Sequence, residues 1–152
     1  MSPFNHPHRN QLHHEIPFKI HPDHKVFFLT ICGEPRGQNQ LATEDVFSDL
    51  KQTTDLYNHK GKWWCHLLLA MPDHVHLIAR IPDTQRLSKV VGDWKKFFVR
   101  SHAIRWQRNY FDHRLRSSES YRQKSEYILE NPVRAGLVDH FEDWPYRWVP
   151  EG

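Results

Sequence analysis

Two apolar segments joined by a very short turn limit the folds open to this chain more than any other feature. Residues 63–70 and 74–81 are dominated by Leu, Ile, Val, Ala and Trp, and the turn between them contains Pro72 and Asp73. Strands linked this closely are typical of an antiparallel hairpin. The sequence therefore predicts an antiparallel sheet that contains this hairpin.

Hydrophobic periodicity predicts five further elements around the hairpin. In chain order they are a strand at 26–32, a helix at 43–58, a long helix at 86–106, a strand at 110–115 and a helix from Ser118 to about Asn131. Ser118 is the expected N-cap of the last helix, and Pro132 disfavours its continuation. The order β-α-β-β-α-β-α predicts an α+β fold: a ferredoxin-like antiparallel sheet of the split βαβ type, with helices on one face and an added C-terminal helix.

The composition allows one domain and excludes several classes of protein. Hydrophobic residues make up only 38% of the 152 residues, but 6 Trp, 5 Tyr and 9 Phe supply large side chains for a core. Cys32 and Cys65 are far apart, which argues against a disulfide framework and a Cys-based zinc finger. No apolar run approaches the roughly 18 residues of a membrane span, and the N-terminus lacks the apolar core of a signal peptide. We expect a cytoplasmic protein with no membrane partner.

Residues 1–24 differ from the rest of the chain. They hold six His and four Pro and follow neither a helical nor a strand period. A His-rich tract can bind metal, but chain termini are more commonly poorly ordered or draped over the surface. We interpret residues 1–24 as an N-terminal arm of open role and residues 25–152 as the single domain.

Positive charge is concentrated in one part of the chain. Residues 86–124 contain 11 Lys and Arg but 3 Asp and Glu, for a net charge of +8, whereas the whole chain carries +3. Such a block suits a polyanionic partner, although a merely solvated basic face is the alternative. The candidate phosphate-binding residues in this block are Arg86, Lys89, Lys96, Arg100, Arg105, Arg108, Arg114 and Arg116.

Two pairs of residues could carry chemistry. His74 and His76 point to the same face of their predicted strand, where two imidazoles can chelate a divalent cation or simply be solvated or satisfied in the core. Tyr127 and Asn131 share one face of the last helix, where they either reach a cleft or serve as an edge tyrosine and a C-terminal cap. Together the four could hold a metal beside a hydroxyl nucleophile. A phenol, with a pKa of about 10, needs a strongly polarised electrophile such as a metal-bound phosphate.

The segments MPDHVHLIAR, WQRNYFDHRLR and YILENPVRAGLVDHFEDWPYRW resemble the REP-associated tyrosine transposases, relatives of the single-Tyr HUH transposases. The resemblance covers roughly residues 24–148. It implies a ferredoxin-like sheet with the histidine pair on a central strand and the nucleophile on a following helix. By motif match, His74, His76 and Asn131 would bind the metal and Tyr127 would be the nucleophile.

The resemblance also implies a reaction. Tyr127 would cleave single-stranded DNA beside a hairpin of the palindromic repeat type, leaving a 5′-phosphotyrosyl bond and a free 3′-OH for later strand transfer. The mixed and open ligand set suits Mg²⁺ or Mn²⁺, and Arg134 could contact a phosphate. We expect a monomer, with a dimer as the alternative. Two other functions stay open: a catalytically idle nucleic-acid-binding module on the same fold, and a metal-dependent hydrolase that uses water.

Overall fold

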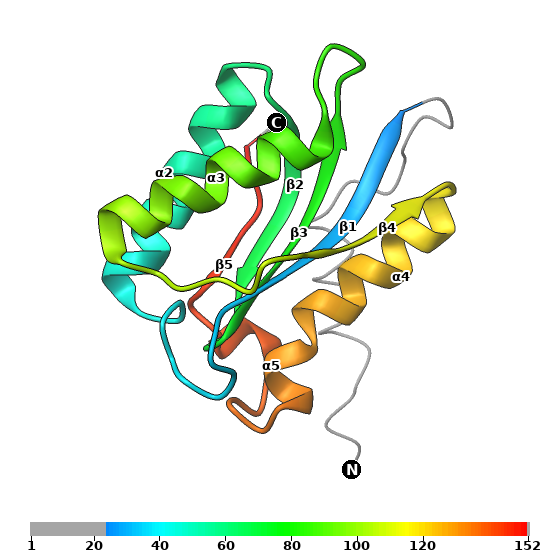
Figure 1. The fold of residues 1–152 in the computed structure, drawn as a ribbon. Coiled ribbons are helices and arrows are strands. Elements are labelled where there is room, and N and C mark those ends of the chain that lie inside the picture. The colour runs from blue at the N-terminus through cyan, green and yellow to red at the C-terminus, as the bar shows by residue number, and fades with distance from the viewer. Residues whose placement is uncertain (1–23, 152) are drawn as a thin grey trace.

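A five-stranded antiparallel sheet forms the centre of the protein (Figure 1). The structure, a computed structural model, describes residues 24–151, so nearly all of the predicted arm lies outside the described residues. The strands are β1 (Lys25–Cys32), β2 (Trp64–Ala70), β3 (His74–Ile81), β4 (Phe111–Leu115) and β5 (Arg147–Trp148). The helices are α2 (Glu44–His59), α3 (Leu87–His102), α4 (Ser118–Leu129) and α5 (Asn131–Arg134), followed by a 3₁₀ turn at Phe141–Asp143.

The strand order confirms the predicted fold class. It runs β4-β1-β3-β2-β5, so the first four strands have the ferredoxin-like arrangement with β3 inside the sheet. The predicted hairpin is present, because β2 pairs antiparallel with β3. Strand β5 was not predicted. It has only two residues, paired with Leu68 and Leu69, which is too short for a hydrophobic pattern.

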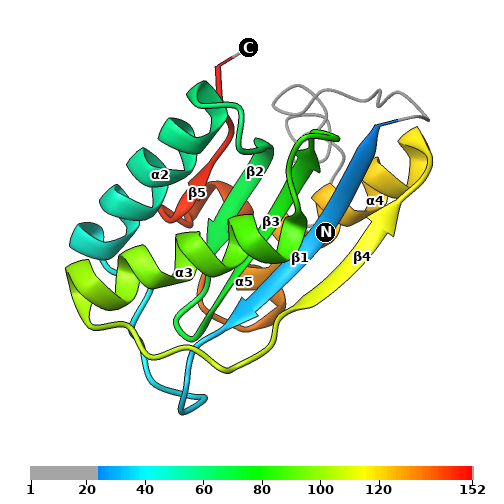
Figure 2. The same cartoon turned by 45° about the horizontal axis from the view of Figure 1, so that its top comes forward.

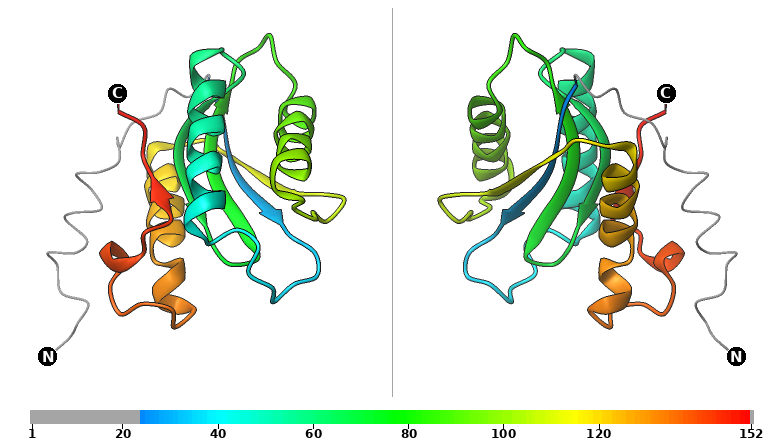
Figure 3. Two further views of the ribbon diagram at one scale, coloured as in Figure 1. Left: turned by 90° about the vertical axis from the view of Figure 1, so that its left-hand side faces the viewer. Right: turned by 90° about the vertical axis from the view of Figure 1, so that its right-hand side faces the viewer.

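Helices cover both faces of the sheet (Figure 3). The helices α2 and α3 pack on the face that presents Leu29, Ile31 and Leu77, as expected for the split βαβ unit. The added helix α4 packs on the other face, against Phe28 and Ile78. Successive residues of the strands point to opposite faces of the sheet, and apolar side chains occur on both faces. Each face therefore needs a layer of helices to bury it. Among residues 24–151, no helix is both long and apolar enough to cross a membrane.

The long basic helix is shorter than predicted. It ends at His102 instead of residue 106, and Ala103 adopts a left-handed conformation with φ of 55°. The next residues pair with the sheet instead of extending the helix. Trp106 bridges to Gly33, and the backbone N–H of Gln107 donates to the carbonyl of Cys32 at 2.8 Å. Tertiary pairing therefore overrides the helical period here.

The last helix differs from the prediction at both ends. Ser117, not Ser118, is its N-cap, in a capping box with Ser120. The helix ends at Leu129, and Pro132 then lies in the first turn of α5 instead of stopping the chain. A proline is tolerated at that position because its missing N–H would have no helical partner there. Gly136 follows with φ of 74°, the left-handed conformation that glycine favours.

Candidate active site

The two histidines of β3 lie side by side on the α4 face of the sheet. Residues two apart on a strand share a face, and the ring centroids of His74 and His76 are 4.7 Å apart. Cys32 lies opposite His74 and Thr30 opposite His76 on β1. The predicted pairing of these imidazoles is therefore present in the fold.

An aspartate that we did not single out for the site fixes the orientation of His74. Asp73 Oδ1 accepts a hydrogen bond from His74 Nδ1 at 2.8 Å. Arg36 Nε and the backbone N–H of Gly37 donate to Asp73 Oδ2 at 2.9 Å and 2.8 Å. Burial opposes the charge of Asp73, but these donors outweigh it and hold its pKa well below its usual value. An ionised carboxylate at Nδ1 favours the tautomer of His74 whose Nε2 carries a lone pair.

His76 is more deeply enclosed than His74. It is 5% exposed, stacks on Phe28 at 5.4 Å between centroids, and its Nδ1 lies 3.1 Å from the hydroxyl of Thr30. Burial, followed by the neighbouring His74, lowers the pKa of His76 to about 3. Burial also lowers the pKa of His74. Both rings are therefore neutral at neutral pH.

The helical residues Tyr127 and Asn131 reach the same place from α4 and α5. Glu130, the residue between α4 and α5, keeps right-handed helical backbone angles, so the two remain one turn apart. Asn131 Nδ2 donates to His74 Nε2 at 3.3 Å. The Tyr127 ring lies 6.3 Å from the rings of both His76 and Phe28, and its side chain is 47% exposed. Four candidate residues from distant parts of the sequence thus converge.

Two cations flank the Tyr127 ring. The guanidinium carbon of Arg134 lies 4.0 Å from the ring centroid, and Arg134 also donates to the backbone carbonyl of Tyr127 at 2.6 Å. Lys124 Nζ lies 5.3 Å from the same centroid. Arg134 was expected to contact phosphate, whereas Lys124 was missed as a site residue. Its position three residues before Tyr127 on one helix was the available signal.

The site has a donor set that fits a divalent cation. Within residues 24–151, no cluster of three or more His, Cys, Asp or Glu side chains is suited to a metal, so the two histidines need another kind of ligand. Asn131 could supply it, because a half-turn of its planar amide exchanges nitrogen for oxygen beside His74 Nε2. Two neutral imidazoles and one amide oxygen are suitable ligands for first-row divalent ions.

The basic block lies mostly away from these residues. Lys89, Lys96 and Arg100 are on α3, on the opposite side of the sheet from Tyr127, and Arg86 is the residue before that helix. Arg105 and Arg108 lie in the segment after α3, Arg114 on β4 and Arg116 after it. All are exposed except the half-buried Arg114, and Lys89 pairs with Asp93 at 2.8 Å. The structure does not bring this block to the histidine pair.

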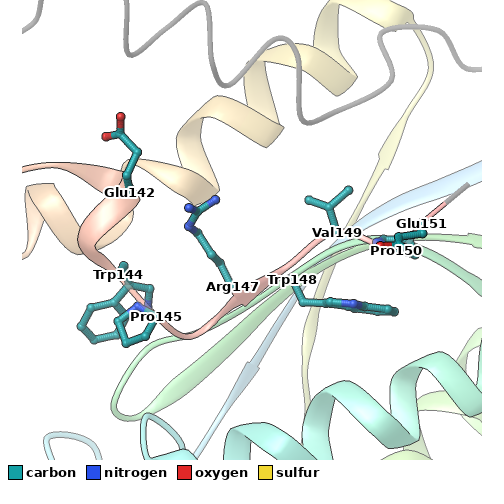
Figure 4. Close-up of a pocket in the computed structure, with 8 residues that line it drawn as sticks. All are labelled: Glu142, Trp144, Pro145, Arg147, Trp148, Val149, Pro150 and Glu151. Carbon is teal, nitrogen blue, oxygen red and sulfur yellow. The ribbon is translucent and has the colours of Figure 1, made fainter.

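A cavity of about 550 Å³ lies along the C-terminal segment, beside β5 (Figure 4). Arg147 points from β5 toward α4, and its guanidinium lies 5.3 Å from the ring centroid of Phe141. Trp148 points to the other side of the sheet. Glu142 and Glu151 also line this cavity. Their carboxylates make it a poor place for a phosphate.

Comparisons with known proteins identify relatives of this chain. A REP-associated tyrosine transposase of Escherichia coli K12 is 31% identical over 124 residues, spanning 80% of this chain and 74% of its own. A Haemophilus influenzae protein named for the same transposases is 27% identical over 140 residues, spanning 80% and 77%. No family model matches the chain.

A solved structure has the same fold. A REP-associated tyrosine transposase bound to a REP hairpin superposes with a TM-score of 0.72, at 23% identity, over 97% of this chain and 82% of that one. With the sequence matches, this places the protein in a defined group. The chain belongs to the REP-associated tyrosine transposases.

Proposed function

We propose that the protein is a metal-dependent endonuclease and strand transferase for single-stranded DNA next to a hairpin. The observation that carries the proposal is the convergence of His74, His76 and Asn131 beside the half-exposed Tyr127. Membership of the transposase family and the hairpin bound to its structural neighbour support the choice of substrate.

His74, His76 and Asn131 are the residues that would hold Mg²⁺ or Mn²⁺. The bound ion would polarise the scissile phosphate and offset negative charge in the transition state. Asp73 and Thr30 prepare the ligands, because each contacts the Nδ1 of one imidazole and so leaves its Nε2 to face the cation.

The chemical step is a transesterification at Tyr127. Its phenolic oxygen bonds to phosphorus, the bond from phosphorus to the 3′ oxygen breaks, and the downstream DNA fragment stays attached to the protein through its 5′ phosphate. The phenol loses its proton to solvent and the leaving 3′ oxygen gains one. The exchange requires no oxidant, reductant or nucleotide cofactor. Attack of another 3′-OH on the phosphotyrosyl bond reverses the step and joins strands.

Arg134 and Lys124 support the nucleophile. Their positive charges lie against the Tyr127 ring and stabilise the phenolate that forms as the proton leaves. Tyr127 is exposed enough for a strand to reach it from solvent. The cations on and after α3 attract the remaining phosphates, whose contacts are independent of base sequence.

A covalent-adduct assay tests the proposal. Protein, a hairpin-flanked single strand and Mn²⁺ or Mg²⁺ should give a DNA–protein band that survives denaturation. Tyr127→Phe should abolish the band, and Tyr110→Phe, a half-buried tyrosine near β4, should keep it. A band that persists in Tyr127→Phe would disprove the nucleophile. Binding without cleavage would favour an idle binding module, and cleavage without an adduct would favour a hydrolase that uses water.

A further inference from the structure

A groove of about 550 Å³ lies between α3 and the segment that follows it. It is on the face of the sheet opposite Tyr127. Its floor is apolar, formed by Gly92, Val99, Ile104 and Trp106, and its rim is mostly basic. The volume falls within the range of about 300–1,000 Å³ typical of small-ligand pockets. Neither the histidine pair nor Tyr127 lines it.

Trp106 is held as a fixed wall of this groove. Its Nε1 donates to the backbone carbonyl of Lys95 at 3.1 Å, and its ring centroid lies 5.5 Å from that of the buried Trp94. Lys95 Nζ donates to the backbone carbonyls of Gln107 and Arg108 at 2.8 Å and 3.3 Å. The segment beside the groove is thus tied to α3, and Trp106 needs no rearrangement to receive a ligand.

Gly92 keeps the groove open. It lies inside α3, where glycine is unfavourable relative to alanine. A Cβ built on Gly92 meets no atom within 4 Å, so packing does not require a glycine at this position. A larger residue at this position would therefore enter the groove without displacing the core.

The rim of the groove is complementary to phosphate. Lys96, Arg105 and Arg108 are exposed there, against the single carboxylate of Glu34. Proteins hold single-stranded nucleic acid by combining such cations with an aromatic surface for the bases. An apolar floor with a basic rim suits one nucleotide of a single strand, whose base is free to enter the groove. It suits a duplex less, because the bases of a duplex are stacked inside the helix.

The groove lies at the same end of the sheet as the active site. Gly33 bridges to Trp106, while the preceding residue, Cys32, lies opposite His74. Figure 2 shows α3 and its following segment in front of the sheet and α5 behind it, at the end where β1 finishes. A strand that passes around this end can contact both faces.

We propose that this groove binds one unstacked base of the DNA strand, with its neighbouring phosphates on Lys96, Arg105 and Arg108. The proposal rests on the proposed function, because it assigns a second contact to the same single-stranded substrate. The base would pack on Trp106 above Gly92. This contact adds affinity at a place distinct from the reacting phosphate.

Two helix-compatible variants test the groove. Gly92→Leu fills it without changing charge, and Gly92→Ala is the matched control. Both are made in Tyr127→Phe protein, which removes the proposed chemistry, and thermal unfolding checks that both fold. Titration with a hairpin-flanked single strand should show roughly tenfold weaker binding for Gly92→Leu than for Gly92→Ala, the size of one lost base-stacking contact. Binding of the same sequence as a full duplex should be equal in the two.

A cross-link locates the base. A strand carrying 5-iododeoxyuridine should photo-cross-link to Trp106 in the Gly92→Ala protein and lose that cross-link in Gly92→Leu. The groove assignment would be overturned if the two variants bound the single strand with equal affinity. It would also be overturned if Gly92→Leu weakened duplex binding as much as single-strand binding. Adduct formation through Tyr127 in the otherwise unchanged chain would then still support the proposed function. If no DNA binds any variant, both proposals are wrong.

Discussion

The two faces of the sheet near the end of β1 present opposite kinds of polar surface. On the α4 face, His74 and His76 are neutral and largely buried; His74 donates a hydrogen bond to Asp73, and His76 is hydrogen-bonded with Thr30. On the α3 face, the cations extend into solvent around an apolar groove. The first face suits a single reaction geometry and the second suits a long, sequence-tolerant polyanion. The proposed chemistry therefore belongs to the α4 face, and the proposed holding of the DNA strand belongs to the α3 face.

The largest expected effect comes from removing Asp73. Asp73→Ala should weaken Mn²⁺ binding by about 10–100-fold, because His74 loses the partner that sets its tautomer. Isothermal titration measures the affinity, and ¹⁵N shifts of the metal-free protein report the tautomer of His74. Asp93→Ala, an acidic residue on the α3 face, is the control. If both variants bind Mn²⁺ like the parent, Asp73 has no role in the site.

Acid should destabilise the fold through a buried histidine on the α4 face. His66 of β2 packs on Tyr121 with 5.4 Å between ring centroids, and burial, followed by Arg80 and His24, lowers its pKa to about 4. An unfolded histidine takes up a proton near pH 6.5. Between pH 6.5 and 4 the unfolded state therefore binds more protons, and the free energy of unfolding falls as pH drops through this window. Above it, His66 adds no pH dependence.

Urea unfolding at pH 7 and pH 5 measures this contribution. At pH 5 the linkage at His66 amounts to about 2 kcal/mol. His66→Phe should lose this part of the acid sensitivity and keep the part due to His74 and His76. His59→Gln, at the exposed end of α2, serves as the control. If the free energy of unfolding changes between pH 7 and pH 5 by the same amount in the parent and in His66→Phe, the assignment to His66 is contradicted.

The smallest effects are expected from replacing the charges on α3. Replacing Lys96 and Arg100 with Ala should weaken single-strand binding about tenfold at low salt. It should also reduce the slope of log affinity against log salt by about 1.4, since each phosphate contact contributes roughly 0.7. Lys89→Ala should change less, because its ammonium already pairs with Asp93. Lys51→Ala on α2 is the control, and an unchanged slope in the double variant would move the DNA path elsewhere.

Much of the fold could be predicted because its signals are local. The short turn at Pro72 and Asp73 required the hairpin, and alternation along β3 placed His74 and His76 on one face. Two of the errors lie where distant residues decide. Helix α3 stops at His102 because Gln107 pairs with Cys32, and β5 exists only because β2 offers Leu68 and Leu69 as partners.

Local periodicity is enough to tell which side chains share a face of one element. The spacing of Tyr127 and Asn131, like that of the two histidines, follows from the helical and strand periods alone. Which faces meet depends on long-range packing, because these contacts join residues far apart in the chain. Thr30 and His76 are 46 positions apart, Arg36 and Asp73 are 37 apart, and His74 and Asn131 are 57 apart. Helical and strand periods carry no information about such contacts. The folded structure was therefore needed to find the role of Asp73, the sheet face that α4 covers and the groove at Gly92.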